Sequence, residues 1–440
     1  MTLQIDETYL LDLASRLVEI PSVSGSEQAI IDFLEQEFCA LGLHCHRFPL
    51  EPGRDNLLVG AHGVAVSQPA QGRVQSFPPP GRGRKKVGAK GSSGPPPAPP
   101  PRRGEELPSV APVSDRPVES RDDSKREAVQ EGPVLCLNAH ADTVPPTGRS
   151  QPRANAIEGR LYGLGSCDDK GPLAAMAAAL LALKDSRLQG RLDLLVTIEE
   201  ETLGRGARQV IAQGYRCNWA IVAEPTSLQI VPAHAGLVFL RLQAVGKACH
   251  GATPEKGENA IEKLFAFIQS LRAQASSAVK PHPLIGSPSL NLGVLRGGDA
   301  PNRVADRAEA FVDIRVIPPF TTADVMRLVD QMLARSEWRG ITRELRKAGE
   351  ALSTPTDGSL VGAMKESAAQ VTGINSSIAG LRAWTEAESF QTGLGIEAVV
   401  FGPGSVEHAH TEDEFVPVDE LVVAARIYAN CALRLLGGSA

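Results

Sequence analysis

The sequence predicts an α/β fold: a catalytic domain on a mostly parallel sheet, with an inserted α+β domain of ferredoxin-like βαββαβ order. Apolar runs alternate with helical patterns over most of the chain, which indicates βαβ units. Near residue 234 the pattern changes to that of a compact α+β unit. Four apolar runs end at, or lead into, a carboxylate or a histidine: residues 134–140, 192–201, 219–224 and 398–401. Ligands of open α/β sheets bind beyond the carboxyl ends of the strands, so we expect the functional site there.

Two helices and a short strand are expected at the start of the chain. Apolar residues at helical spacing predict a helix over residues 10–18 that ends at Pro21. A second helix is expected to begin near Ser24, with Glu27 three residues later as in a capping box, and to end at Gly42. Residues 56–59 predict a short strand.

Residues 63–130 differ sharply in composition from the rest of the chain. They are rich in Pro, Gly, Arg, Lys and Ser, and they have too few apolar side chains to offset the entropy lost on ordering. We interpret them as a disordered surface insertion. Their basic cluster could bind an anionic partner, but a solvated linker is the better interpretation; it comprises Arg82, Arg84, Lys85, Lys86 and Lys90.

The later elements complete two domains. An Ala-rich apolar stretch at 172–183 predicts a buried helix with Pro172 in its first turn. The smaller domain is expected to contain strands at 238–245, 290–294 and 309–316 and helices at 259–272 and 322–335. The expected divisions are 1–62, 131–232 and 352–440 for the catalytic domain, 63–130 for the insertion and 233–351 for a dimerisation and lid domain.

Length, charge and cysteine usage limit the classes of protein. The 440 residues can form more than one core, and the net charge of -6 gives no basic field for nucleic acid. The seven cysteines contain no CxxC pair, which favours a reducing compartment over a disulfide framework. No secretory signal pattern is present, and no apolar run approaches the length of about 18 residues that spans a membrane. We therefore predict a soluble cytoplasmic protein without a membrane or nucleic-acid partner.

His140-Ala141-Asp142 follows the first of the four runs. Because strand side chains alternate with a period of two, His140 and Asp142 point to the same side. This arrangement suits a metal-ligating imidazole whose other ring nitrogen is held by a carboxylate. Taken alone, the motif is more often a capped strand end.

Carboxylates follow two further elements. Asp168 and Asp169 lie in a turn that leads into the buried helix, where they either complement the helix dipole or, together with His140, hold cations. Three glutamates at 199–201 follow the second run. Neighbouring side chains there point in different directions, so one can ligate a metal while the next reaches the water to be activated. An exposed acidic loop is the alternative.

Glu224 closes the third run, and His410 lies in the loop after the fourth. Taken singly, Glu224 is interpreted as a solvated residue at the end of a strand, and His410 as an ordinary loop residue. Taken together, the five elements supply two histidines and at least three carboxylates. Two divalent ions about 3.5 to 4 Å apart require such a donor set. The coincidence of five such elements favours a two-metal site.

Motifs spread over the chain carry these residues: His140-Ala-Asp142-Thr-Val-Pro145, Cys167-Asp-Asp-Lys-Gly171, Glu200-Glu201-Thr-Leu-Gly-Arg-Gly206, Glu224-Pro-Thr-Ser227, Gly297-Gly-Asp-Ala-Pro-Asn302-Arg303, Asp313-Ile-Arg315 and Gly402-Pro-Gly-Ser405. They resemble the co-catalytic zinc aminoacylase and peptidase family that includes acetylornithine deacetylases, succinyl-diaminopimelate desuccinylases and carboxypeptidase G. The resemblance looks nearest to the acetylornithine deacetylases. It covers the chain except for the insertion, which the family pattern lacks.

The resemblance implies a role for each residue of the site. The implied set is His140 and Glu224 at one metal, Glu201 and His410 at the other, Asp168 bridging both, Glu200 as general base and Asp142 as the partner of His140. The residues at 202–208 favour this register of the three glutamates over a shift by one. In this family the peptide bond after the bridging aspartate is often cis, so we expect that bond here.

Three residues of the smaller domain match positions that the family uses on its substrate. His250 corresponds to a histidine that reaches across a homodimer and stabilises the oxyanion in the partner's active site. A lone histidine on a loop is otherwise a surface residue. Asn302 and Arg315 match residues that hold the substrate carboxylate and carbonyl, and a planar guanidinium suits a carboxylate. Arg315 could equally form a structural ion pair.

The implied activity is hydrolysis of a linear amide that removes a small N-acyl group from an amino acid. The leading substrate is N-acetyl-L-ornithine, in arginine biosynthesis; two Zn²⁺ are the expected cofactors, and Co²⁺ or Mn²⁺ fit the same donors. Alternatives are succinyl-diaminopimelate desuccinylation, acetylcitrulline deacetylation, and dipeptidase or carboxypeptidase activity. In the segment 384–388, Glu386 or Glu388 could meet a cationic substrate group. A non-catalytic binding protein is the alternative of another class.

Overall fold

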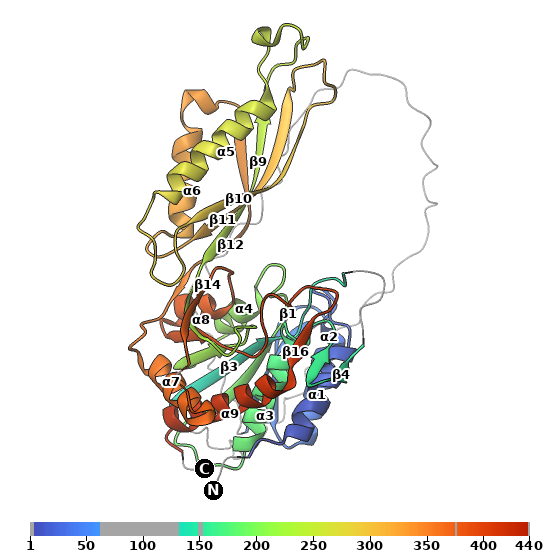
Figure 1. Ribbon diagram of the computed structural model, residues 1–440, viewed down its shortest axis with the longest axis vertical. Helices are drawn as coiled ribbons and strands as arrows, with labels where there is room; N and C mark the ends of the chain where they lie inside the picture. Colours follow the sequence, from blue (N-terminus) through green and yellow to red (C-terminus); the bar gives the residue numbers. More distant parts are fainter. Residues whose placement is uncertain (1–3, 62–131, 148–152, 375, 439–440) are drawn as a thin grey trace, which may run out of the picture. The chain divides into compact units, whose positions relative to one another are not determined.

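The computed structural model describes residues 4–61, 132–147, 153–374 and 376–438 (Figure 1). The predicted insertion at 63–130 lies outside the described residues, and the domain boundaries stay predictions. Within the described ranges, no helix is both long and apolar enough to cross a membrane.

A nine-stranded sheet contains the four predicted apolar runs as its central strands. These strands lie in the order β6-β3-β7-β15 and are parallel to one another. The central strands are β3 (Val134–His140), β6 (Arg191–Thr197), β7 (Trp219–Val222) and β15 (Glu397–Val400). The outer strands are β1 (His44–Glu51), β2 (Arg54–Gly60), β8 (Ile230–His234), β13 (Leu352–Ser353) and β14 (Ile378–Leu381). Apolar runs without alternation are expected for strands that are buried on both faces.

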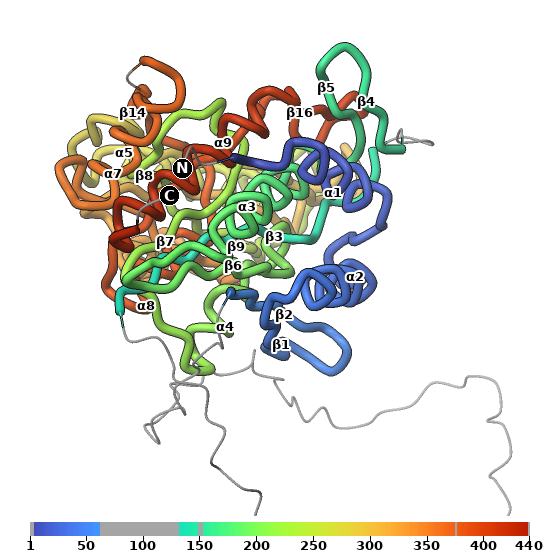
Figure 2. The backbone as a smooth tube through the Cα atoms, turned by 90° about the horizontal axis from the view of Figure 1, so that it is seen from below, coloured from blue at the N-terminus to red at the C-terminus, as the bar shows by residue number. Residues whose placement is uncertain are grey.

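Two hydrophobic cores cover the two faces of this sheet. Leu135 and Leu137 of β3 belong to one core, whereas Val134 and Cys136 belong to the other, because alternate side chains point to opposite faces. The first core contains α1 (Glu7–Glu19), α2 (Gln28–Ala40), α3 (Lys170–Leu183), α7 (Ser359–Thr372) and α9 (Val418–Leu435). The second contains α4 (Gly206–Ala212) and α8 (Ala387–Leu394). Figure 2 shows α3 beside α1 and α9, and its alanines permit this close packing.

A four-stranded antiparallel sheet follows β8 and has the order β10-β11-β9-β12. Its elements are β9 (Gly236–Val245), α5 (Ala260–Ser276), β10 (Ser289–Gly297), β11 (Arg307–Val316), α6 (Thr322–Leu333) and β12 (Ile341–Gly349), with short 3-10 helices η2 (Pro254–Lys256) and η3 (Ser336–Trp338). The predicted βαββαβ order and the α/β fold class are confirmed. The sequence did not locate β12, because this edge strand is rich in charged residues.

One expectation near the start of the chain fails, and the structure contains a further small sheet that was not predicted. The predicted capping box at Ser24 is wrong, because α2 begins at Gln28 and the N-cap residue is Glu27. The Glu27 carboxylate instead accepts two hydrogen bonds from Arg54. A third sheet, of order β16-β5-β4, is built from β4 (Asn155–Ile157), β5 (Arg160–Tyr162) and β16 (Phe415–Pro417).

Candidate metal centre

The carboxyl ends of the central strands place the predicted site residues along one edge of the sheet. Because β3 pairs in parallel with β6 and β7, the residues that follow these strands emerge at the same edge. His140 is the last residue of β3, the three glutamates at 199–201 follow β6, and Glu224 follows β7. The loop after β15 carries His410. Segments that are distant in the sequence therefore meet at this edge.

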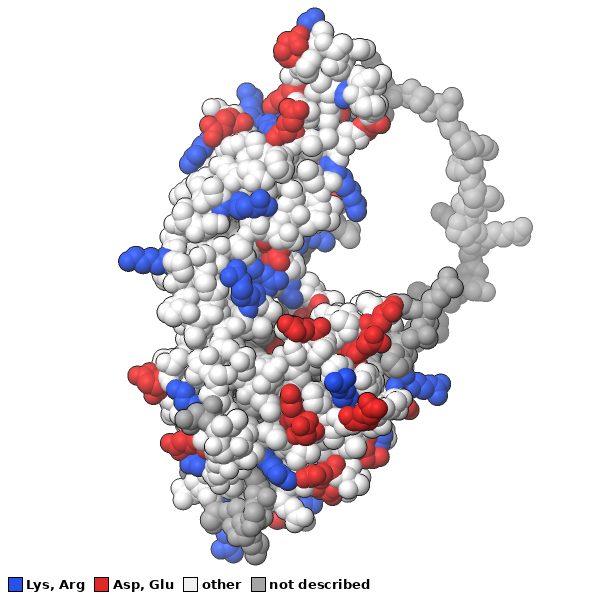
Figure 3. Space-filling model, in the orientation of Figure 1, with Lys and Arg blue, Asp and Glu red and all other residues white. Residues whose placement is uncertain are grey.

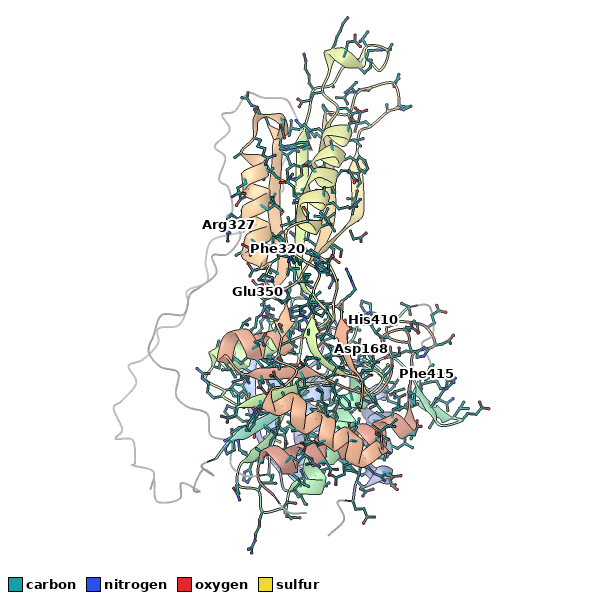
Figure 4. All side chains as sticks on the ribbon, turned by 60° about the vertical axis from the view of Figure 1, so that its left-hand side comes forward. Asp168, Phe320, Arg327, Glu350, His410 and Phe415 are labelled. Carbon is teal, nitrogen blue, oxygen red and sulfur yellow. The ribbon has the colours of Figure 1, made fainter. Side chains whose placement is uncertain are left out.

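Asp168 lies between the two predicted histidine ligands. His140 Nε2 is 2.9 Å from Asp168 Oδ1, and His410 Nε2 is 3.4 Å from Asp168 Oδ2. His410 Nε2 is also 2.9 Å from Glu201 Oε1. One ligand atom from each of His140, Asp168 and Glu201 lies within 4.8 Å of the others. Figure 4 shows Asp168 beside His410, and each oxygen of this carboxylate faces a different histidine, as a ligand shared by two ions requires.

The three consecutive glutamates have different surroundings. Glu199 has a φ of 69°, and its carboxylate forms ion pairs with Arg54 and Arg205. Glu201 contacts a predicted histidine ligand. Glu200 is 9% exposed, and its carboxylate has no hydrogen bond or ion pair within the described part of the chain. Because Glu199 is held by two guanidinium groups, the geometry favours Glu201 as the ligand and Glu200 as the free carboxylate.

Asp142 holds the turn that carries these glutamates. Its carboxylate accepts hydrogen bonds from the backbone N–H groups of Glu200 at 3.1 Å and Glu201 at 3.2 Å. It also accepts one from the hydroxyl of Ser24 at 2.6 Å. His140 Nδ1 lies 3.0 Å from the backbone oxygen of Asp142 and 3.5 Å from its carboxylate. Asp142 thus lies beside His140 as predicted, and it also positions the glutamate turn; Ser24 is a site residue that sequence reasoning misplaced.

The turn that carries Asp168 is held by a buried carboxylate that the sequence does not single out. Glu414 Oε1 accepts hydrogen bonds from the backbone N–H groups of Cys167 at 3.0 Å and Asp168 at 3.1 Å. Its other oxygen has no partner among the residues described. The peptide bond between Asp168 and Asp169 is cis, as expected. The position of Glu414, four residues after His410, is its only sequence signal.

Buried negative charge dominates this site. Burial raises the pKa of Glu200 to about 8, and the nearby charge of Glu201 adds to this shift. Burial and the charges of Asp168 and Glu200 raise the pKa of Glu224 well above its usual range. Hydrogen bonds to Asp168 and Glu201 raise the pKa of His410 to about 10. Carboxylates that destabilise one another in this way are stabilised by cations, so the donor set fits divalent metal ions.

Four predicted residues make no hydrogen bond or ion pair with these ligands. Glu224 lies at the correct edge, but its carboxylate has no such partner in the described ranges. His250 and Asn302 are exposed and lie on loops of the four-stranded sheet. Arg315 of β11 forms an ion pair with Asp313 at 3.0 Å, which is the structural alternative considered from the sequence. The functional roles of all four stay predictions.

The segment 384–388 makes internal contacts. Glu386 is buried and accepts hydrogen bonds from the Thr197 hydroxyl at 2.5 Å and the Ala207 N–H at 2.8 Å. Glu388 forms an ion pair with Arg208. Both carboxylates are therefore occupied within the protein, and the geometry does not support the idea that they meet a cationic substrate group.

Known proteins are similar to this chain in sequence. Residues 136–434 match peptidase family M20/M25/M40. The chain is 34% identical to acetylornithine deacetylase of Proteus mirabilis (strain HI4320) over 295 residues, which cover 64% of this chain and 74% of that protein. It is 31% identical to acetylornithine deacetylase of Myxococcus xanthus over 317 residues, which cover 69% of this chain and 81% of that protein.

Solved structures share the fold at lower identity. A tripeptidase from Staphylococcus aureus has a TM-score of 0.69 and 19% identity, covering 98% of this chain and 99% of that one. A dinuclear metal binding peptidase of family M20 from Bacillus subtilis has a TM-score of 0.62 and 15% identity, covering 98% and 99%. Because the family match spans more than half of the sequence, the chain belongs to peptidase family M20/M25/M40 and is a hydrolase of that family.

Proposed function

We propose that this protein is a metal-dependent amidohydrolase that converts N-acetyl-L-ornithine and water into L-ornithine and acetate. The observation that carries the proposal is the position of Asp168, whose two oxygens face two different histidines. The choice of substrate rests on two relatives, both acetylornithine deacetylases, at 34% and 31% identity.

The donor set would provide two metal positions. His140 and Glu224 would hold one ion, Glu201 and His410 would hold the other, and Asp168 would be shared by both. When bound, the two ions polarise the acyl carbonyl and make a water molecule more acidic. Zn²⁺ suits this mixture of imidazole and carboxylate donors, and Co²⁺ or Mn²⁺ accept the same set.

Glu200 is the general base in this proposal. Its carboxylate is buried beside the ligands, and the Asp142 carboxylate fixes its main chain through a hydrogen bond of 3.1 Å. Glu200 takes a proton from the attacking water. As the C–N bond breaks, the same carboxyl group gives this proton to the leaving amine, so Glu200 ends the cycle unchanged.

We also propose a homodimer that works in the cytoplasm, in arginine biosynthesis. His250 is exposed and makes no hydrogen bond or ion pair with the ligands of its own chain, which suits a residue that acts on a partner's site. All seven cysteines are free, which suits a reducing compartment.

One face of the described residues shows how their charged side chains are distributed. On the face shown in Figure 3, acidic and basic side chains of the described residues lie interspersed. Binding of a nucleic acid requires a continuous basic patch or stripe. The interspersed charges on this face give the binding-protein alternative no support, and the basic cluster that motivates it lies outside the described residues.

Initial rates on N-acetyl-L-ornithine, N-acetylcitrulline, N-succinyl-diaminopimelate and a dipeptide test the proposal. We expect the highest kcat/KM on acetylornithine, loss of activity with a chelator and recovery with Zn²⁺. The Glu200→Gln variant, purified in the same way, controls for a contaminating hydrolase. Activity confined to the succinyl compound or to the dipeptide would rule out the acetylornithine assignment.

A further inference from the structure

Lys347 on β12 places an unpaired ammonium group in a half-buried position. Its Nζ lies 4.6 Å from the centroid of the Trp384 ring. Among the described residues it has no hydrogen bond and no ion pair, and burial lowers its pKa. An aromatic face compensates only part of the cost of removing an ammonium group from water, since its three N–H donors still lack acceptors.

The Trp384 ring connects Lys347 to the glutamate turn of the metal centre. A Cβ added to Gly204 would lie 2.2 Å from Trp384 Cη2, so the main chain at Gly204 packs directly on the indole. The Gly204 N–H donates to the backbone oxygen of Glu199 at 2.7 Å, which closes the turn that contains Glu200. A Cβ added to Gly349 of β12 would lie 2.2 Å from Trp384 Nε1. The ammonium and the turn that contains the proposed base therefore lie beside the same ring.

Two other cations that could take a carboxylate already have acceptors. The guanidinium of Arg208, 5.6 Å from the Trp384 ring centroid, is paired with Glu388. Arg315, the residue that the sequence predicts for a substrate carboxylate, is paired with Asp313. Lys347 faces the charge of Glu200 without forming an ion pair with it. Lys347 is thus the cation near the described glutamate turn that can accept a new anionic partner without losing an existing one.

We propose that Lys347 binds the α-carboxylate of the N-acyl amino acid, and this inference rests on the proposed function. The α-carboxylate is attached to the carbon that bears the scissile nitrogen, so it must lie close to Glu200 when the amide does. An ammonium–carboxylate contact away from bulk water gives a strong, charge-assisted hydrogen bond. Lys347 is accordingly a specificity-determining residue, which selects amino acids with a free carboxylate over their amides.

The test compares N-acetyl-L-ornithine with its α-carboxamide on the full-length protein. Lys347→Met is expected to raise KM for the acid about 10- to 100-fold, with kcat changed little and with KM for the carboxamide unchanged. Lys347→Arg should restore most of the affinity for the acid. Arg346→Met is the matched control, because Arg346 is an exposed neighbour paired with Glu344.

If Lys347→Met raised KM equally for the acid and the carboxamide, the inference would be overturned. A shift of the pH profile of kcat with KM unchanged would also overturn it. A loss confined to N-succinyl substrates would also overturn it, because the bound carboxylate would then belong to the acyl group. Calorimetric titration with L-ornithine and its amide separates this inference from the proposed function. If the wild type hydrolyses neither substrate but binds ornithine in a Lys347-dependent manner, the proposed function fails and the carboxylate site stands; if Lys347→Met leaves ornithine binding unchanged, the inference fails.

Discussion

The two larger sheets of the molecule differ in how they arrange the residues that the sequence marks as functional. At the edge of the nine-stranded sheet, His140, Asp168 and Glu201 bring ligand atoms within 4.8 Å of one another. On the four-stranded sheet, His250 and Arg315 make no hydrogen bond or ion pair with that cluster. Neighbouring parallel strands end at a common edge of the sheet, so the residues that follow them in the sequence lie close together in space. Neighbouring antiparallel strands end at opposite edges of a sheet, so their last residues are not brought together. Functional residues on such a sheet can instead act on the site of a second subunit.

The largest effect is expected at the glutamate turn of the nine-stranded sheet. Glu200→Gln should lower kcat by about 10² to 10⁴, or about 3 to 5 kcal/mol, because it removes the proposed base. Its metal content should match that of the wild type, whereas Glu201→Gln should also lose metal. Metal analysis with steady-state kinetics checks both variants. The opposite pattern of metal loss would shift the assignment by one residue.

A smaller effect is expected at His234, the last residue of β8, where the chain passes to the four-stranded sheet. His234 is fully buried, and burial lowers its pKa to about 4, against about 6.5 in an unfolded chain. Between these values the unfolded state binds more protons, so this group lowers the free energy of unfolding as pH falls, by about 3 kcal/mol in total.

Urea denaturation of wild type and His234→Leu at pH 7, 5 and 4 measures this contribution to the free energy of unfolding. The difference in the free energy of unfolding between the two proteins should change by about 3 kcal/mol between pH 7 and pH 4. The exposed-residue variant His44→Asn serves as the control. A constant difference across this pH range would show that His234 does not remain neutral in the folded protein.

A further effect, on metal affinity, is expected at Glu414, which holds the turn that carries Asp168. Glu414→Ala removes the acceptor of the Cys167 and Asp168 N–H groups, so metal affinity should fall about 10- to 100-fold, as for other residues that orient ligands. Glu414→Gln keeps a carbonyl oxygen for both N–H groups and should retain most of the affinity. Competition with a chelator gives the metal Kd. Equal losses in the two variants would indicate that the charge of Glu414 matters more than its hydrogen bonds.

The smallest effect on metal binding is expected on the four-stranded sheet. His250→Ala should leave the metal content unchanged, because His250 is exposed and apart from the ligands. If His250 acts across a dimer, this inactive variant mixed with inactive Glu200→Gln should regain activity. Loss of metal in His250→Ala would show that a residue of the four-stranded sheet also contributes to metal binding.

The sequence located the four central strands of the nine-stranded sheet, for a physical reason. Central parallel strands are buried on both faces, and their uninterrupted apolar runs marked β3, β6, β7 and β15. The charged residues that close those runs then indicated the site. For the register of the three glutamates, the structure adds a contact that local pattern could not supply: Arg54, which lies 145 positions before Glu199, pairs with its carboxylate. The register itself stays a prediction.

The residues that the sequence missed act through long-range contacts. Ser24 looked like a helix cap, but its hydroxyl donates to Asp142, 118 positions away. Glu414 is one of several acidic residues after His410, and only the fold shows that it holds the turn of Asp168. Lys347, which we propose binds the substrate carboxylate, lies on the charged edge strand that the sequence did not locate. Local pattern does not reveal which polar residue of a charged run faces the site.

Anomalous diffraction from crystals grown with Zn²⁺ would show whether two ions share Asp168. We expect two metal peaks per chain, about 3.5 to 4 Å apart, with Asp168 between them. One peak should lie beside His140 and the other beside His410. A single peak, or metal bound away from Asp168, would contradict the proposed two-metal site.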